Sequence, residues 1–224
     1  MSHQIDKKGL FITFEGGEGA GKSTQITKLR VAFEQRGYDV IQTREPGGCP
    51  EAEQIRDLIL QSEQHHFDPL SETLLLYAAR YEHVKKKIQP ALDAGKIVLC
   101  DRFADSTLVY QGYAGGLSLS LLESLYTLLI GDLKPDLTFV LDLPIELSSE
   151  RTQSRGLPQD RFESKEQDFH ASLRHGFLDL AKKYPERMIV IDASGTIEDV
   201  FRQILEALKE KRHCICNALS LLVN

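Results

Sequence analysis

The sequence predicts a three-layer α/β fold, in which a five-stranded parallel β-sheet is flanked by helices. Five short runs rich in β-branched and apolar residues alternate with longer segments of helical spacing, and this alternation is typical of βα units. The composition agrees, because 42% hydrophobic and 27% charged residues are ordinary values for a globular domain. Fibrous and disordered classes of protein are excluded, and 224 residues favour one compact domain.

The expected strands and helices follow one another along the whole chain. A first helix begins near Lys22 and ends at Gly37, and Pro90 interrupts a helical stretch from Ser71 to Ala94. The last helix is the plainest, with apolar residues three or four positions apart from Ile197 to Leu208. The expected strands are Leu10 to Phe14, Asp39 to Thr43, Ile97 to Cys100, Leu137 to Leu143 and Met188 to Ile191.

Two stretches depart from this alternation. Residues 151–163 are charged and contain Gly156 and Pro158, so we expect them to form a short mobile lid on the surface. Residues 213–224 form a C-terminal tail to which the sequence assigns no role. We therefore expect a single domain over residues 1–212.

Charge and apolar patterning limit the partners. The net charge is −6, from 27 basic and 33 acidic residues, which disfavours a nucleic-acid binder that relies on a basic surface. The longest apolar runs fall far short of the roughly 20 residues that a membrane span needs. The polar N-terminus lacks the apolar core of a secretion signal, and the four cysteines lack metal-site spacing. We expect a cytoplasmic protein without nucleic-acid or membrane partners.

A glycine-rich motif follows the first strand directly. Residues 16–24 read GGEGAGKST, which fits G-x-x-x-x-G-K-[ST], and a helix begins within the motif. Glycines allow successive backbone N–H groups to surround a phosphate at a helix N-terminus. The sequence therefore predicts a P-loop, with Lys22 on the β- and γ-phosphates and the Ser23 hydroxyl as a ligand of Mg²⁺. The expected nucleotide-binding residues are Gly16, Gly17, Glu18, Gly19, Ala20, Gly21, Lys22, Ser23 and Thr24.

The third strand ends in a carboxylate beside an arginine. Asp101 and Arg102 stand at the edge of the sheet where ligands bind in α/β folds. We expect Asp101 to hold Mg²⁺ or its water, together with Ser23. A GTPase would also carry an Asn/Thr-Lys-x-Asp motif after a later strand, and this chain has none.

Further blocks of sequence lie between residues 14 and 161, and the similarity that they carry covers essentially residues 9–208. They are FEG at 14–16, TREPGG at 43–48, YAAR at 77–80, DR at 101–102, ST at 106–107, YQG at 110–112, KPDLT at 134–138, RG at 155–156 and DR at 160–161. Together with the P-loop, this set resembles the bacterial thymidylate kinases and is highly specific. The resemblance implies transfer of the γ-phosphoryl group of ATP to dTMP, which yields dTDP and ADP in dTTP biosynthesis.

The resemblance also implies roles for individual residues. Arg44 and Arg102 face the acceptor phosphate, Arg80 reads the thymine edge, Glu18 contacts the sugar 3′-hydroxyl, and Tyr110 crowds the 2′ position. Converging arginines suit the chemistry, because the reaction brings several negative phosphates together. The expected dTMP-binding residues are Glu18, Arg44, Leu76, Arg80, Arg102, Ser106, Thr107, Tyr110 and Gln111.

The arginines expected in the lid resemble the bacterial type of the family, which carries arginines in the lid and no arginine in the P-loop. Arg151 and Arg155 are four residues apart, so they share a face if a helix extends that far, and lid closure can bring one over the transferring phosphoryl group. The expected catalytic residues are Lys22, Arg102, Arg151, Arg155 and Arg161. The family is generally homodimeric, which implies a homodimer, and the apolar residues of stretch 71–95 are a candidate face.

Two positions depart from the family pattern. Leu76 stands where a Phe commonly stacks on thymine, which weakens the base contact by about 1 kcal/mol, and Gln153 stands where another lid arginine is common. The Glu45–Pro46 bond is expected to be cis, like the equivalent turn in the family. Two alternatives stay open: another deoxynucleotide or nucleoside monophosphate kinase on the same fold, which Leu76 favours, and a nucleotide-binding regulatory protein that transfers nothing.

Overall fold

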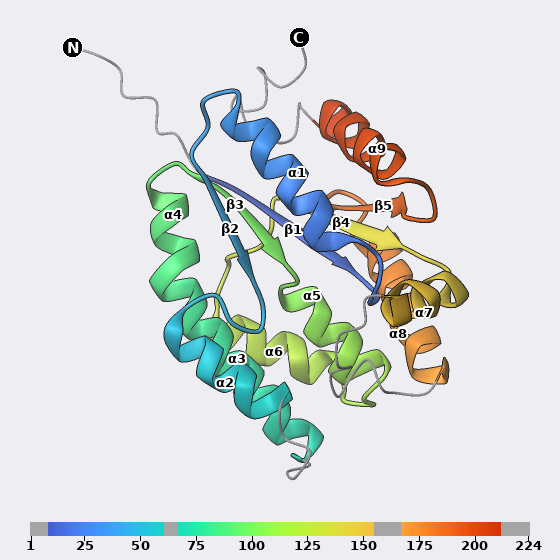
Figure 1. Ribbon diagram of the computed structural model, residues 1–224. Helices are drawn as coiled ribbons and strands as arrows, with labels where there is room; N and C mark the ends of the chain where they lie inside the picture. Colours follow the sequence, from blue (N-terminus) through green and yellow to red (C-terminus); the bar gives the residue numbers. More distant parts are fainter. Residues whose placement is uncertain (1–8, 61–66, 155–166, 212–224) are drawn as a thin grey trace, which may run out of the picture.

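β1 (Leu10–Gly16) lies at the centre of a five-stranded sheet in which every pair of neighbouring strands is parallel (Figure 1). The strand order is β2-β3-β1-β4-β5. The computed structural model describes residues 9–60, 67–154 and 167–211, and over these ranges the predicted fold class is confirmed. The other strands are β2 (Val40–Arg44), β3 (Ile97–Asp101), β4 (Leu137–Asp142) and β5 (Met188–Asp192).

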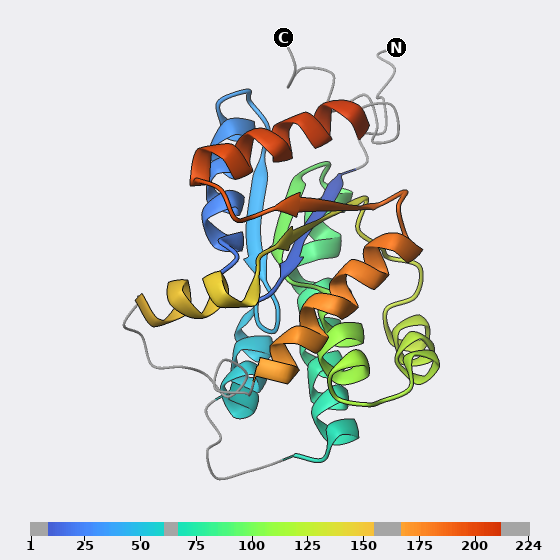
Figure 2. The same cartoon turned by 90° about the vertical axis from the view of Figure 1, so that its right-hand side faces the viewer.

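Helices cover both faces of the sheet (Figure 2). On one face, α1 (Lys22–Glu34) and α9 (Ile197–Glu210) pack together over the main apolar core, which includes the fully buried side chains of Phe14, Phe33 and Phe139. On the other face, α8 (Gln167–Lys183) packs against β4 and β5, and α4 (Gln89–Asp93) packs against β3. The predicted three layers follow from this arrangement. None of the described helices is long and apolar enough to cross a bilayer.

The remaining helices gather beyond the carboxyl ends of β1, β2 and β3 (Figure 1). This region contains the turn after each of these strands, so it positions the side chains that the sequence singled out. Its helices are α2 (Pro50–Leu60), α3 (Pro69–His83), α5 (Ala104–Thr107) and α6 (Leu119–Leu129), and α7 (Ile145–Ser154) follows β4.

Two of these helices continue into wider π-helical turns. The expected interruption at Pro90 appears in this form, because η1 (Val84–Ile88) joins α3 to α4 and the N–H of Gln89 donates to the Val84 carbonyl five residues back. The wider turn accommodates a proline that has no N–H to donate. In the same way α5 continues into η2 (Leu108–Tyr113), where the N–H of Ala114 donates to the Val109 carbonyl. The helical path therefore continues through both segments.

Candidate active site

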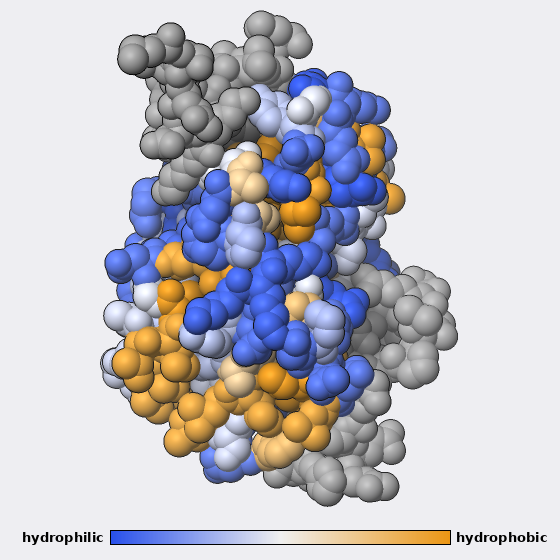
Figure 3. All heavy atoms as spheres, turned by 90° about the vertical axis from the view of Figure 1, so that its left-hand side faces the viewer, coloured by the Kyte–Doolittle hydropathy of each residue, from blue (hydrophilic) through white to orange (hydrophobic). Residues whose placement is uncertain are grey.

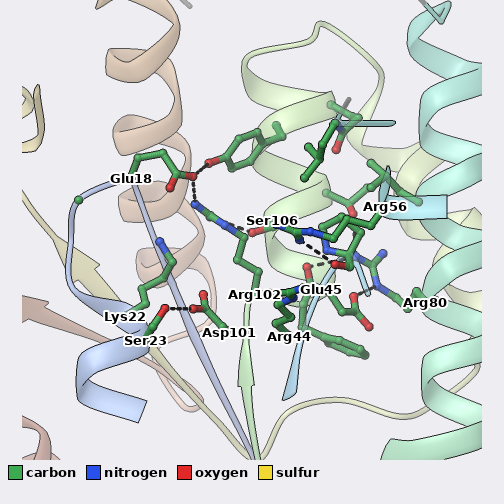
Figure 4. A pocket seen from close by; sticks show the side chains of 18 of the residues that line it. Glu18, Lys22, Ser23, Arg44, Glu45, Arg56, Arg80, Asp101, Arg102 and Ser106 are labelled. Atoms are coloured by element: carbon green, nitrogen blue, oxygen red, sulfur yellow. Dashed lines mark hydrogen bonds and ion pairs between the residues drawn. The ribbon is translucent and has the colours of Figure 1, made fainter. Parts of the chain in front are cut away.

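A cavity of about 410 Å³ opens between the P-loop, β2, β3, α3 and the α5–η2 helix. Figure 4 shows Lys22, Ser23 and Asp101 at one end of it and Arg80 and Glu45 at the other, with Arg102 between them. Predicted residues from separate parts of the chain therefore share one site. Those that line the cavity are Glu18, Gly19, Gly21, Lys22, Ser23, Thr24, Arg44, Leu76, Arg80, Asp101, Arg102, Ser106, Thr107, Tyr110 and Gln111.

The P-loop curls around the amino group of Lys22. The Nζ atom donates to the carbonyls of Gly16 and Gly17, at 3.2 and 2.8 Å. Gly16 has a φ of +128°, and a Cβ there would lie 2.4 Å from the Leu141 carbonyl oxygen, so only glycine fits this close approach. Burial lowers the pKa of Lys22, and the positive charge of Arg102 lowers it further. A bound phosphate would oppose both effects, so the loop is built for an anion.

Ser23 and Asp101 form a pair at the start of α1. The Ser23 hydroxyl donates to a carboxylate oxygen of Asp101 at 2.7 Å. Magnesium in nucleotide sites usually takes few protein oxygens and completes its shell with water and phosphate oxygens. One hydroxyl and one carboxylate at this separation fit such an ion.

Arg102 is held in the middle of the cavity by contacts on several sides. Its backbone has a φ of +65°, the left-handed region that a non-glycine residue rarely adopts. Its guanidinium pairs with the Glu18 carboxylate, donates to the Gly16 carbonyl at 2.9 Å and lies 5.0 Å from the Tyr110 ring centroid. Burial opposes ionisation of Glu18, but the charges of Arg102 and Lys22 outweigh it and lower the pKa of Glu18 to about 2.

Glu15, near the end of β1, holds the turn after β3 in place, and its side chain is fully buried. Its carboxylate accepts from the N–H of Phe103 at 2.8 Å and from the hydroxyl of Ser106 at 2.6 Å. Burial raises the pKa of Glu15 to about 7, and the negative charge of Asp105 adds to this effect against the opposing charge of Arg102. The strained backbone at Arg102 is thus anchored to β1 through one carboxylate.

Arg80 is fixed at the opposite end of the cavity. Its Nε donates to Glu45 at 2.7 Å, and its Nη2 donates to the hydroxyl of Thr107 at 2.9 Å and to the Phe103 carbonyl at 3.2 Å. His83 holds the other oxygen of Glu45, with its Nδ1 at 2.9 Å. Among the described residues, the buried Nη1 of Arg80 has no hydrogen-bond partner.

Gln111 lies on η2 in the same cavity wall. Its Nε2 donates to the Glu72 carboxylate at 3.1 Å. Its Oε1 is buried and accepts no hydrogen bond from any residue in the described ranges. The wall therefore holds one unused donor, on Arg80, and one unused acceptor, on Gln111.

Sequence reasoning did not assign roles to several residues of the cavity wall. Arg56 on α2 donates to the carbonyl of Pro46 at 2.8 Å, and its position on a polar helix face gave no signal. Glu45 and Pro46 fall in the TREPGG block, and the predicted cis bond between them is confirmed. The unassigned lining residues are Glu45, Pro46, Arg56, Leu60 and Phe103.

Some predicted residues lie elsewhere. Gly16, Gly17 and Ala20 belong to the P-loop but do not line the cavity. Arg151 is on α7, as the expected helix extends to Ser154, and its guanidinium donates to the carbonyls of Ala193 at 3.0 Å and Ser194 at 3.3 Å, after β5. Arg155 and Arg161 lie outside the described residues, so their role stays a prediction.

Known proteins resemble this chain over most of its length. The family model described as thymidylate kinase matches residues 14–204. The chain is 48% identical to thymidylate kinase of Syntrophotalea carbinolica over 200 residues, which are 87% of this chain and 93% of that protein. It is 47% identical to thymidylate kinase of Caulobacter vibrioides, over 91% of this chain and 98% of that one. A crystal structure of thymidylate kinase from Ehrlichia chaffeensis is similar with a TM-score of 0.71 and 37% identity, covering 89% of this chain and 98% of that chain.

The buried carboxylate of Glu15 predicts a pH dependence of stability. Its pKa is about 7 in the folded protein against an ordinary 4.5, so the folded state holds the proton more tightly than the unfolded state. The unfolding free energy should therefore fall as pH rises from 5 to 8, by about 3 kcal/mol from this group. Glu15→Gln should remove that part of the slope in denaturant titrations. Glu34→Gln, which alters a more exposed carboxylate on α1, is the control, and an unchanged slope in Glu15→Gln would contradict the prediction.

Proposed function

The chain belongs to the thymidylate kinase family and transfers the γ-phosphoryl group of ATP to dTMP, and we propose that the cavity between the P-loop and α3 holds both substrates end to end. The triphosphate lies at the P-loop, and dTMP lies between Arg102 and Arg80. Figure 4 supports this division, because the cationic groups are spread along the cavity from Lys22 to Arg80. Transfer needs the two phosphates to meet between these ends.

The hydrogen-bonding pattern near Arg80 is the observation that carries the assignment of the acceptor base. Thymine presents an acceptor, O4, next to a donor, the N3–H group. Arg80 offers an unused donor, Nη1, and Gln111 an unused acceptor, Oε1. Cytosine presents the opposite pair at these atoms, because its N4 donates and its N3 accepts, so the wall favours thymine over cytosine.

The phosphates of both substrates require positive charge. Lys22 neutralises the β- and γ-phosphates of ATP, while Arg44 and Arg102 hold the phosphate of dTMP. Ser23 and Asp101 hold Mg²⁺, which supplies charge neutralisation at the triphosphate when it is bound. The carboxylate of Glu18 accepts a hydrogen bond from the 3′-hydroxyl of the sugar. The side chain of Tyr110, beside it, leaves no room for a 2′-hydroxyl. These roles follow the family pattern and rest here on cavity position and contacts.

In the reaction, an oxygen of the dTMP phosphate attacks the γ-phosphorus of ATP. A new P–O bond forms, the bond from the γ-phosphorus to the β–γ bridging oxygen breaks, and ADP leaves with that electron pair. Arg102, held at Glu18 and Gly16, lies where charge builds up between donor and acceptor. In this proposal Arg155 and Arg161 of the lid close over the phosphoryl group, while Arg151 holds the turn after β5.

An exposed apolar area supports a homodimer. Figure 3 shows apolar side chains gathered over the lower part of the side where α2 and α3 lie. Solitary exposed apolar residues are ordinary, but a contiguous area of this kind is typical of an interface. The exposed leucines on the described parts of α2, α3 and α6 are Leu58, Leu70, Leu74, Leu121 and Leu128. A cytoplasmic location, where both substrates are made, completes the proposal.

A panel of acceptors tests the function. With ATP and Mg²⁺, coupled ADP release should be at least about a hundredfold more efficient with dTMP than with dCMP, AMP or GMP, because mismatched edges leave buried groups unpaired. The ribonucleotide analogue of dTMP should be a poor acceptor. A preference for another monophosphate would instead support a related kinase. ATP binding without acceptor-dependent ADP release would support the regulatory alternative.

The substitution of Leu76 predicts an improvable base contact. Leu76→Phe should lower the KM for dTMP about fivefold, because an aromatic ring on thymine adds roughly 1 kcal/mol over an aliphatic contact. Steady-state kinetics with varied dTMP measure this. Tyr81→Phe, at an exposed position of the same helix, should leave the KM unchanged. An unchanged or raised KM for Leu76→Phe would show that Leu76 does not face the base.

The dimer can be tested by disrupting the apolar area. Leu74 is 47% exposed on α3, and Leu74→Glu should convert a dimer into a monomer in sedimentation velocity, because it buries an unpaired charge in the interface. Val31→Glu, at a 39% exposed position on α1, is the control and should stay dimeric. A wild-type protein that sediments as a monomer at micromolar concentration would contradict the proposal.

A further inference from the structure

Three residues of α3 stand one turn apart on the face toward the cavity. Glu72, Leu76 and Arg80 are spaced by four residues, which aligns them on one side of a helix. Leu76 and Arg80 line the cavity, and Glu72 lies one turn before them, 5% exposed, in contact with Gln111. Glu72 is thus placed behind the base site and not in it.

The contact between Glu72 and Gln111 fixes the direction in which the amide of Gln111 points. A primary amide has a donor end and an acceptor end, and it can turn over to match either kind of partner. A carboxylate only accepts, so the nitrogen of Gln111 must point to Glu72, at 3.1 Å. The oxygen of the amide is then the atom left for a ligand, in agreement with its lack of a partner among the described residues.

Arg80 has no such ambiguity. Glu45 and Thr107 fix its orientation, but every polar hydrogen of a guanidinium is a donor, so its contribution to the base site stays a donor whichever nitrogen is free. Leu76 offers only an aliphatic contact, which does not distinguish one pyrimidine edge from another. Discrimination between bases at the N3 position therefore depends on the orientation of one amide.

We propose that Glu72 is a positioning residue that sets the polarity of base recognition, so that the enzyme accepts a pyrimidine with an N3–H group and rejects one with an unprotonated N3. The proposal rests on the function proposed above, in which dTMP occupies this end of the cavity. Glu72 acts through Gln111 and does not itself touch the base. Its removal should change which base is chosen more than how fast phosphoryl transfer occurs.

The test is the ratio of kcat/KM for dTMP to kcat/KM for dCMP. Glu72→Gln keeps the shape but can donate to the Gln111 oxygen, which frees the amide to turn. The ratio should fall at least about tenfold, because a turned amide gives up one hydrogen bond to thymine and can make one to cytosine. Glu72→Asp, which keeps the carboxylate, should retain most of the ratio. Glu82→Gln, which alters a carboxylate paired with Lys86 on the far part of the same helix, should retain all of it.

A double-mutant cycle separates positioning from packing. Gln111→Met removes the amide, so it should lower the ratio by itself, and adding Glu72→Gln should lower it no further. If Glu72→Gln does not fold, Glu72→Met serves as the second variant of similar length, with the same expected loss. An unchanged ratio, or an equal loss of kcat/KM for both acceptors, would overturn the inference. A wild-type enzyme that does not prefer dTMP would instead overturn the proposed function.

Discussion

The cavity depends on carboxylates that hold its polar groups in place from behind. Glu15 anchors the turn that carries Arg102, Glu45 holds Arg80, and Glu72 holds Gln111. Buried charges are costly unless they are paired, so a site that gathers several cations for phosphates must contain fixed anions as well. The pairing also restricts rotation, because each long side chain loses freedom before a substrate arrives.

Two carboxylates at this site, those of Glu18 and Glu15, have opposite electrostatic characters because their surroundings differ. Glu18 lies at the cavity edge beside Arg102 and Lys22, and it stays ionised far below neutral pH. Glu15 is buried near the carboxyl end of β1, where burial and the negative charge of Asp105 raise its pKa to about 7. A charged group thus lines the cavity, while a group that is easily neutralised supports the backbone. The same residue type performs both tasks through environment alone.

Local patterns explain how far the sequence could be interpreted. The strands, the P-loop and the pair of Asp101 with Arg102 were predicted because each is encoded in a contiguous stretch or by its place after a strand. Glu72, Arg56 and the bracing role of Glu15 were missed, since each acts through contacts distant in sequence: Glu72 meets Gln111 across 39 positions, and Glu15 meets Ser106 across 91. Spacing along one helix gives no sign of such partners, and an isolated Glu is normally interpreted as a surface residue.

The helix formed by α5 and η2 determines which side chains this wall of the cavity presents. In an ordinary α-helix, residues four apart share a face, and the fifth is displaced by roughly 100°. Here Ser106, Tyr110 and Gln111 all line the cavity, and the turn contains the five-residue hydrogen bond from Ala114 to Val109. Thr107 lines it too, and since Ser106 and Tyr110, like Thr107 and Gln111, are four residues apart, these two pairs form one stripe on the cavity side of the helix. Loss of one residue between Thr107 and Tyr110 would break both pairs at once and rotate Tyr110 and Gln111 away from the face that Ser106 and Thr107 occupy.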